Sequence, residues 1–208
     1  AEGGGHASGD VDGVLKNPNV DMVVRQEGLI TFPKLCHSIE KGLSKRNSTS
    51  ILGVSYKDKN GKTIHNPNRP FIQNLDILAP RQLTIPLHKM YDTQEHTGGS
   101  RGMQLGRHAY IMTSLGCPGH CRFCMSDLMS GSKTRFFSLE RVEENVRRLA
   151  EARVTESIVE DDQLLADIPR AMKIMDIFKK YSMIWFEEGG VSMFKLMKPG
   201  HGLTYKSI

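Results

Sequence analysis

The chain has 208 residues, of which 38% are apolar and 25% charged, and its formal net charge is +5. This composition is typical of a soluble globular protein with one or two domains. The longest apolar runs fall short of about 18 residues and no signal-peptide pattern is visible, so we expect no membrane span. Lysines and arginines alternate with acidic residues, which argues against nucleic-acid binding. Three of the four cysteines lie close together, which favours a reducing compartment, and we expect a cytoplasmic protein.

The first fifty residues predict an alternation of short helices and strands. A glycine-rich turn over residues 3–8 precedes a short helix over 10–16 and a buried strand over 21–24. Thr31 is predicted to cap a helix that runs from Phe32 to Leu43. The apolar positions of this helix recur at helical spacing and should face the core: Leu35, Cys36, Ile39 and Leu43. Cys36 is therefore expected to be a core residue and not a metal ligand.

The middle of the chain predicts a hairpin and a connector. A strand over residues 51–57 is followed by Asn60-Gly61, a strong turn signal, and by a returning strand over 62–65. The prolines and asparagines of residues 66–70 then break the pattern, and we place a domain boundary near residues 66–90. Residues 91–107 are polar and rich in glycine, as in a surface loop.

The second half predicts strands that alternate with helices, the pattern of a parallel sheet or barrel. Strands are expected over residues 109–112, 157–159 and 183–186. Ser138 and Asp167 are good N-caps for the two helices between them. In the second helix the expected inward residues are Ala171, Met172, Met175 and Phe178. In the first helix, i,i+4 ion pairs are expected between Glu143 and Arg147 and between Glu144 and Arg148.

A cysteine array follows the first of these strands. Cys117, Cys121 and Cys124 stand in a CxxxCxxC spacing, and Pro118-Gly119 allow the loop to wrap its thiols around one centre. Three thiolates are one ligand short of a closed zinc site or of an ordinary four-cysteine cluster. Two interpretations stay open from the residues alone: a zinc knuckle completed by His120 or a distant histidine, and a four-iron cluster with one open iron.

Acidic residues follow the other two predicted strands. Asp161-Asp162 follow the second strand, and Glu187-Glu188 with two glycines follow the third. Sites in parallel sheets and barrels gather at the carboxyl ends of the strands. These carboxylates could accept hydrogen bonds from an amine or a ribose hydroxyl, or they could form an ordinary acidic turn that caps a helix.

The cysteine array, with Phe123 just before its last cysteine, resembles that of the radical S-adenosylmethionine (SAM) superfamily. The resemblance implies that Cys117, Cys121 and Cys124 bind a [4Fe–4S] cluster whose open iron is chelated by SAM. It also implies that Phe123, Asp161 and Asp162 lie at the SAM site, where Glu188 would play a similar part.

The start of the chain carries a second resemblance. The run Gly4-Gly5-His6-Ala7-Ser8, followed by an Asp-x-Val-Val-Arg-Gln-Glu-Gly strand and turn over residues 21–28, is similar to the end of the cobalamin-binding domain of cobalamin-dependent radical SAM proteins. Gln26 departs from the usual glycine. The resemblance implies that Gly4, Gly5 and His6 approach the nucleotide tail of a cobalamin.

These resemblances predict an α/β chain with three parts. Residues 1–50 would be the C-terminal part of a Rossmann-like cobalamin-binding domain, residues 51–108 a hairpin and connector, and residues 109–208 the N-terminal half of a radical SAM (β/α) barrel. We therefore expect a piece of a longer protein, poorly soluble or inactive alone. Its earlier strands would be needed to enclose a cobalamin.

The implied function is that of a cobalamin-dependent radical SAM enzyme. The [4Fe–4S] cluster would reductively cleave SAM to a deoxyadenosyl radical, for methyl transfer to an unactivated carbon of a small-molecule substrate. A reductant such as flavodoxin or ferredoxin would be the electron-donating partner. Two alternatives remain: a zinc- or iron–sulfur-binding structural protein without radical chemistry, and a radical SAM methylthiotransferase. The glycine-rich start weakens the second, because those enzymes would supply further cluster cysteines upstream.

Overall fold

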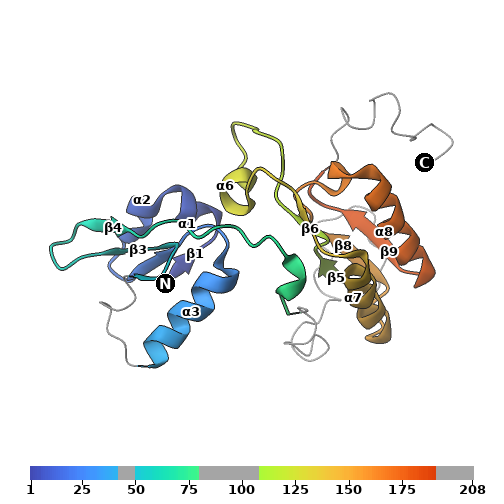
Figure 1. Cartoon of the computed structure of the whole chain (residues 1–208), viewed down its shortest axis with the longest axis horizontal. Helices are drawn as coiled ribbons and strands as arrows, with labels where there is room; N and C mark the ends of the chain where they lie inside the picture. Colours follow the sequence, from blue (N-terminus) through green and yellow to red (C-terminus); the bar gives the residue numbers. More distant parts are fainter. Residues whose placement is uncertain (42–49, 80–107, 191–208) are drawn as a thin grey trace. The chain divides into compact units, whose positions relative to one another are not determined.

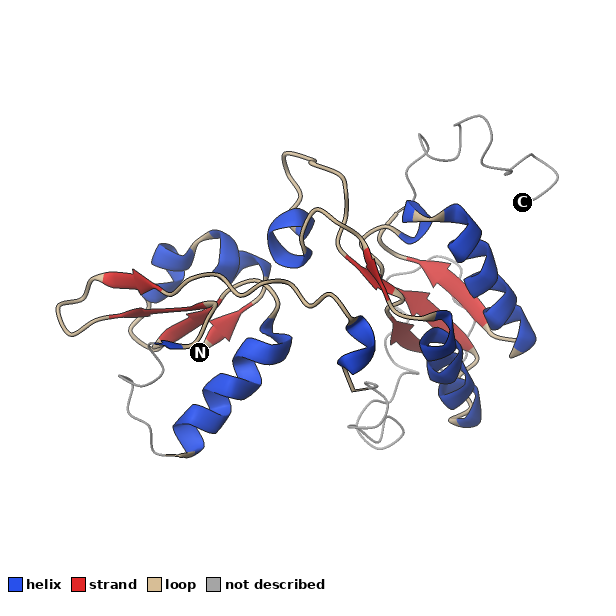
Figure 2. Ribbon diagram, viewed as in Figure 1, coloured by secondary structure: helices blue, strands red, loops and turns tan. Residues whose placement is uncertain are grey.

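A computed structural model describes residues 1–41, 50–79 and 108–190 of the chain (Figures 1 and 2). These residues form two compact units. The first contains residues 1–73 and 116–133, and the second contains residues 74–115 and 134–208, each within the described ranges. Leu43 and the polar loop predicted over residues 91–107 lie outside the described residues.

The first unit is built on a mixed four-stranded sheet. Its strands are β1 (Glu2–Gly3), β2 (Met22–Val24), β3 (Val54–Lys57) and β4 (Thr63–His65), in that spatial order. β1 and β2 are parallel, whereas the pairs β2–β3 and β3–β4 are antiparallel. The predicted hairpin is confirmed, since the chain turns at Gly61 with a φ of 78° between β3 and β4.

Two small cores lie on opposite faces of β2, because successive side chains of a strand point to opposite faces. Val23 packs with Ala7, Val14 and Leu15 from α1 (Gly5–Gly9) and α2 (Val11–Leu15). The neighbouring residues of β2 pack on the other face with α3 (Gly28–Glu40) and β3. The residues of this second core are Met22, Val24, Leu35 and Val54.

The predicted start of α3 was wrong, and of its predicted inward residues within the described ranges only Leu35 is confirmed. The helix begins at Gly28, and Thr31 lies inside it as a buried residue instead of capping it. The Thr31 hydroxyl donates to the Leu52 carbonyl at 3.2 Å and accepts from Nε of Arg69 at 2.7 Å, so it links the helix to the segment around β3. The buried face is Thr31, Leu35 and Ser38. Ile39 is 57% exposed and Cys36 is only half-buried.

The second unit contains the predicted parallel sheet. Its strands are β5 (His108–Ile111), β8 (Glu156–Val159) and β9 (Ile184–Glu187), in the order β5–β8–β9. Both pairs are parallel, which confirms the sequence prediction. The carboxyl ends of the three strands therefore lie along one edge of this sheet.

Two helices cover this sheet, and their predicted caps are confirmed. Ser138 accepts from the Arg141 amide at the start of α7 (Leu139–Glu151), and Asp167 accepts from the Arg170 amide at the start of α8 (Ile168–Lys180). The helices pack against each other, and Phe178 of α8 stacks on Trp185 of β9. The buried side chains of α7 are Val142, Asn145, Val146 and Leu149, and those of α8 are Ile168, Ala171, Ile174 and Phe178.

Two of the inward positions predicted for α8 were wrong. Met172 is exposed and Met175 only half-buried, whereas Ile168 and Ile174 fill the core. The buried residues follow the 3.6-residue period from Ile168, immediately after the Asp167 cap. Short 3-10 turns, η2 (Leu75–Ile77) and η3 (Leu164–Ala166), complete the second unit.

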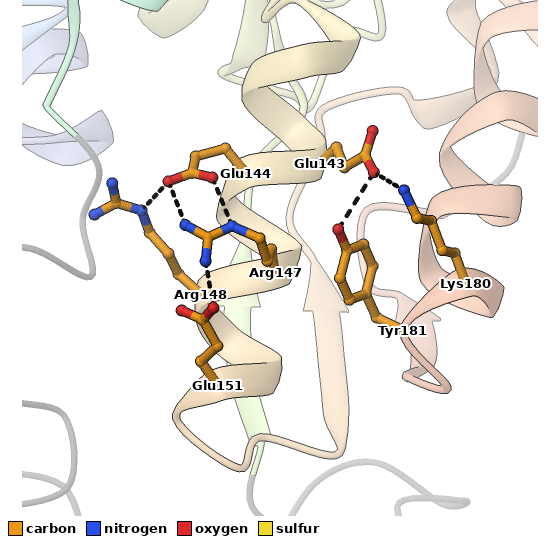
Figure 3. A network of polar contacts seen from close by, with 7 residues as sticks. All are labelled: Glu143, Glu144, Arg147, Arg148, Glu151, Lys180 and Tyr181. Carbon is orange, nitrogen blue, oxygen red and sulfur yellow. Dashed lines mark hydrogen bonds and ion pairs between the residues drawn. The ribbon is translucent and has the colours of Figure 1, made fainter.

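An ion-pair network covers the solvent face of α7 (Figure 3). Glu144 accepts from Arg147 at 2.8 Å and from Arg148 at 2.6 Å, so the predicted Glu144–Arg148 pair is confirmed. The predicted Glu143–Arg147 pair was wrong. Glu143 instead interacts with Lys180 and with the Tyr181 hydroxyl, which joins α7 to the end of α8. None of the helices in the described ranges is both long enough and apolar enough to cross a membrane.

Candidate functional site

The cysteine loop of the first unit closes at a narrow neck. The amide of Cys117 donates to the Gly131 carbonyl at 3.2 Å. Gly116 has a φ of 92°, and a β-carbon on it would stand 2.4 Å from the carbonyl oxygen of Lys133. Only glycine fits this position, because the close approach and the left-handed backbone both exclude a side chain. In the second unit, the residues that flank the loop pair as β6 (Ser114–Leu115) and β7 (Arg135–Phe136).

The three cysteines of the loop form no disulfide, and backbone amides point at the sulfurs of two of them. The Gly119 amide donates to Sγ of Cys117 at 3.4 Å, and the Ser126 amide, at the start of α6 (Ser126–Ser130), donates to Sγ of Cys124 at 3.4 Å. The sulfurs of Cys117 and Cys121 both lie within 4 Å of the position that a β-carbon on Gly119 would take. Amide N–H groups aimed at sulfur favour the thiolate and tune iron–sulfur clusters.

The described residues of this loop are not gathered around a preformed metal site, either for zinc or for a cluster. Within the described ranges, no three side chains that could ligate a metal are gathered around one point. His120, the loop residue predicted as a possible fourth zinc ligand, has its Nδ1 3.4 Å from Oδ2 of Asp127 in α6. Cys121 and Cys124 are exposed, as is Phe123 between them at 91%. A donor set of three accessible thiols fits a [4Fe–4S] cluster that keeps one iron open.

At the sheet edge of the second unit, Asp161 is fully buried and engaged. Its carboxylate accepts from the amide and hydroxyl of Thr113, at 2.6 and 2.5 Å, and from the amide and hydroxyl of Ser114, at 3.1 and 2.7 Å. Four donors occupy both oxygens, so this conformation leaves no acceptor for a ligand. The contact of Asp161 with SAM remains a prediction, and the geometry favours a role in holding the turn after β5.

Arg170 of α8 completes this cluster. Its guanidinium donates to the carbonyls of Thr113 and Phe137, at 3.0 and 2.8 Å, and lies 4.7 Å from the centre of the Phe136 ring. Burial lowers the pKa of Arg170, and the charge of Asp161 opposes that shift. The turn that leads from β5 into β6, three residues before Cys117, is therefore fixed by one buried acid and one half-buried base.

Glu187, at the end of β9, is a functional candidate that sequence reasoning missed. Both of its carboxylate oxygens are buried, and no partner of good hydrogen-bond geometry reaches either oxygen within the described residues. Burial raises the pKa of Glu187 to about 7, the charge of Asp161 adds to the shift, and the Gly189 amide opposes it.

The sequence indicated a site residue at the end of this strand, but the prediction named the next residue, Glu188, instead of Glu187. That residue is exposed, and its amide donates to the Val159 carbonyl at 3.2 Å. Asp162 is half-buried.

The glycine turn of the first unit opens onto a pocket of about 470 Å³. Gly4 has a φ of 93°, and β-carbons on Gly4 or Gly5 would meet no atom of the described residues within 4 Å. The pocket wall includes Gly4, Val24, Gln26, Leu29 and Phe32. His6 is exposed on α1 and is not part of this wall. Of the three residues predicted at a cobalamin tail, the structure therefore places Gly4 in a pocket wall and Gly5 beside it.

The chain is related in sequence to an uncharacterized methyltransferase of Pyrococcus horikoshii. The two are 35% identical over 191 residues, which cover 88% of this chain and 39% of the relative. The chain thus spans about two fifths of the length of this relative. No protein-family model matches the chain.

Two solved structures share the fold. OxsB, a cobalamin-dependent SAM radical enzyme with aqua-cobalamin and SAM bound, superposes with a TM-score of 0.68 at 17% identity, covering 95% of this chain and 26% of OxsB. The radical SAM methyltransferase TsrM from Kitasatospora setae, with cobalamin and a [4Fe–4S] cluster bound, gives 0.58 at 16% identity, covering 86% and 33%. The predicted fold class is confirmed: this chain has the α/β fold of cobalamin-dependent radical SAM enzymes and is related in sequence to a protein named as a methyltransferase.

Proposed function

We propose that this chain is part of a cobalamin-dependent radical SAM methyltransferase, acting on an unactivated carbon of a small-molecule substrate. The observation that carries the proposal is the cysteine loop, which presents three cysteines outside any disulfide, in a CxxxCxxC spacing, after the first strand of a parallel sheet. The names of the relative and of the two structural neighbours support methyl transfer, cobalamin and SAM.

Cys117, Cys121 and Cys124 would hold the [4Fe–4S] cluster. The amides of Gly119 and Ser126 already point at two of the sulfurs and would stabilise their thiolate form. Bound here, the cluster would supply the electron that cleaves SAM reductively, while cobalamin would carry the methyl group. The exposed ring of Phe123 would provide an apolar surface beside SAM.

The strand ends of the second unit would position this chemistry. Asp161 and Arg170 hold the backbone of Thr113 and Ser114 and so fix the start of the chain that enters the cysteine loop. Asp162 and Glu188 are half-buried or exposed at the same edge and could accept hydrogen bonds from the SAM amine or ribose. The glycine turn and its pocket in the first unit would take part of the cobalamin.

The electron donor and the cellular compartment follow from this chemistry. Reductive cleavage needs a low-potential electron donor, and a flavodoxin or ferredoxin would supply it. Oxygen-sensitive clusters and cysteines outside disulfides suit the cytoplasm.

Anaerobic reconstitution with iron and sulfide tests the proposal. We expect a brown protein with about four irons per chain, and an electron paramagnetic resonance (EPR) spectrum of the reduced cluster that changes when SAM is added. Cys117→Ala, Cys121→Ala and Cys124→Ala should each lose the bound iron. Cys36→Ala is the matched control, since Cys36 lies on α3, outside the cysteine loop, and its loss should leave iron content unchanged.

Two results would contradict the proposal. A colourless protein that retains one zinc per chain would indicate a zinc module without radical chemistry. A cluster that forms but does not respond to SAM would indicate an iron–sulfur protein that transfers electrons or holds structure.

A further inference from the structure

Gln26 stands in an unusual backbone conformation beside the pocket of the first unit. Its φ is 60°, in the left-handed region that a residue with a side chain enters at a cost. The backbone N–H of Gln26 donates to the Ser8 hydroxyl at 2.9 Å, which fixes the turn. A side chain held at a position that favours glycine suggests that the side chain itself has a use.

The two charged neighbours of Gln26 are already engaged in the fold. Arg25 donates to Asn68 at 2.6 Å and to the Asn66 carbonyl, and Glu27 accepts from the Ile72 amide at 3.1 Å. Both side chains therefore hold the segment after the hairpin. Nε of Arg25 is buried without a hydrogen-bond partner among the described residues, and so is the side-chain oxygen Oε1 of Gln26. Gln26 is the acceptor of the two, and its side chain lines the pocket. An unpaired buried acceptor is costly unless something outside the described residues satisfies it.

The pocket has the size and the walls of a ligand site. Its volume of about 470 Å³ lies within the usual range for small-molecule sites. Leu29 and Phe32, from the first turns of α3, line it although they remain 48% and 50% exposed. The backbone of Gly4 forms another part of the wall, with open space above it. Apolar walls with one unpaired acceptor fit a flat apolar group that carries a hydroxyl donor.

We propose that Gln26 is a specificity-determining residue of this pocket, where its side-chain oxygen Oε1 accepts a hydrogen bond from a ribose hydroxyl of a corrinoid nucleotide. Leu29 and Phe32 contact the flat base of the same nucleotide. The inference rests on the proposed binding of cobalamin. It goes beyond that proposal because it names Gln26 as the residue that distinguishes corrinoids with the nucleotide from corrinoids without it.

Two corrinoids and two variants test the inference. The ligands are hydroxocobalamin, which carries the complete nucleotide, and cobinamide, which lacks the ribose and base but keeps the corrin ring. Their dissociation constants are measured by spectroscopic titration of the full-length protein. Gln26→Met keeps the length of the side chain and removes the acceptor. It should weaken hydroxocobalamin roughly 2- to 10-fold and leave cobinamide unchanged.

Gln26→Gly separates binding from folding. Glycine relieves the backbone strain at φ 60°, so the melting temperature should rise, while the affinity for hydroxocobalamin should fall as in Gln26→Met. Gln163→Met is the matched control, because the side-chain oxygen of Gln163 is also buried without a partner among the described residues, but Gln163 lies in the second unit. That variant should bind both corrinoids like the unaltered protein.

The possible failures are distinguishable. If the unaltered protein binds neither corrinoid, the proposed cobalamin function fails and this inference fails with it. If it binds cobalamin but the Gln26 variants weaken both corrinoids equally, or neither, only the role of Gln26 is refuted.

Discussion

Asp161 accepts hydrogen bonds from both the amide and the hydroxyl of Thr113, at 2.6 and 2.5 Å, although 48 residues separate them in the sequence. Asp161 follows β8 and Thr113 follows β5, and these strands are parallel neighbours. The contact therefore ties together two strand ends at the sheet edge where ligands bind in such folds. In this structure the Asp161 carboxylate holds the chain that follows β5, because it accepts from the backbone amides of Thr113 and Ser114 as well as from their hydroxyls.

Replacing Asp161 should destabilise the second unit strongly. Asp161→Ala leaves four buried donors of Thr113 and Ser114 without an acceptor, so we expect a loss on the order of 3 kcal/mol or more in the free energy of unfolding. Thr113→Val keeps the shape and removes one of the four donors to Asp161, together with a 3.3 Å contact from Arg170, so it should cost less, about 1 kcal/mol. Urea unfolding followed by circular dichroism measures both. Equal effects of the two variants would contradict a role for Asp161 as the common acceptor.

Glu187 should make stability depend on pH near neutrality. Burial raises its pKa from 4.5 to about 7, so the folded state binds the proton more tightly than the unfolded state. Its contribution is therefore largest below pH 4.5 and is lost as the pH rises from 4.5 towards 7. Glu187→Gln should flatten this slope and stabilise the protein at pH 8 relative to the unaltered chain.

The control for this pH dependence is Glu188→Gln, which neutralises the exposed neighbour. It should leave the slope in place. Thermal unfolding measured between pH 4 and pH 8 gives the comparison. A slope that persists in Glu187→Gln would assign the titration to another group.

The sequence was sufficient wherever a local rule decides the structure. Ser138 and Asp167 cap their helices as predicted, and the hairpin turns at Gly61. The parallel sheet followed from the strand–helix alternation, and the cysteine loop follows β5 as expected. The caps and the hairpin turn depend on residues that are close in sequence, and the parallel sheet pairs distant strands in the one way that a strand–helix–strand alternation favours.

The sequence was not sufficient where distant residues compete for a partner. Glu143 lies four residues before Arg147, yet it interacts with Lys180 and Tyr181, 37 and 38 residues away. Thr31 has the chemistry of a cap but is used to hold Leu52 and Arg69. The engagement of Asp161 by Thr113 likewise depends on the packing of two strand ends, which no spacing in the sequence discloses.

The neck of the cysteine loop should tolerate no side chain. Gly116→Ala places a methyl group 2.4 Å from the Lys133 carbonyl at a φ of 92°, so we expect a loss of roughly 3 kcal/mol or more and a loop that no longer closes. Gly61→Ala is the matched control, because the φ of Gly61, 78°, is also left-handed but no atom of the described part of the chain would lie within 4 Å of the added methyl group. It should cost only about 1 kcal/mol. Thermal unfolding and iron content after reconstitution check both variants, and normal iron loading in Gly116→Ala would refute the role of the neck.

The network on α7 should respond to acid in the opposite direction from Glu187 (Figure 3). Hydrogen bonds from Arg147 and then Arg148 lower the pKa of Glu144 from 4.5 to about 2. Because the folded state holds this carboxylate ionised, its contribution is present above pH 4.5 and is lost as the pH falls towards 2. Glu144→Gln should therefore lower the melting temperature slightly at pH 7 and have no effect near pH 2.

High salt should reduce the difference in melting temperature between Glu144→Gln and the unaltered protein at pH 7, since the network is exposed to solvent. Asp176→Asn, which removes an exposed carboxylate on the neighbouring helix, serves as the control. A drop at pH 7 of the same size in both variants would mean that net charge, and not the arginine contacts of Glu144, sets the stability of this helix.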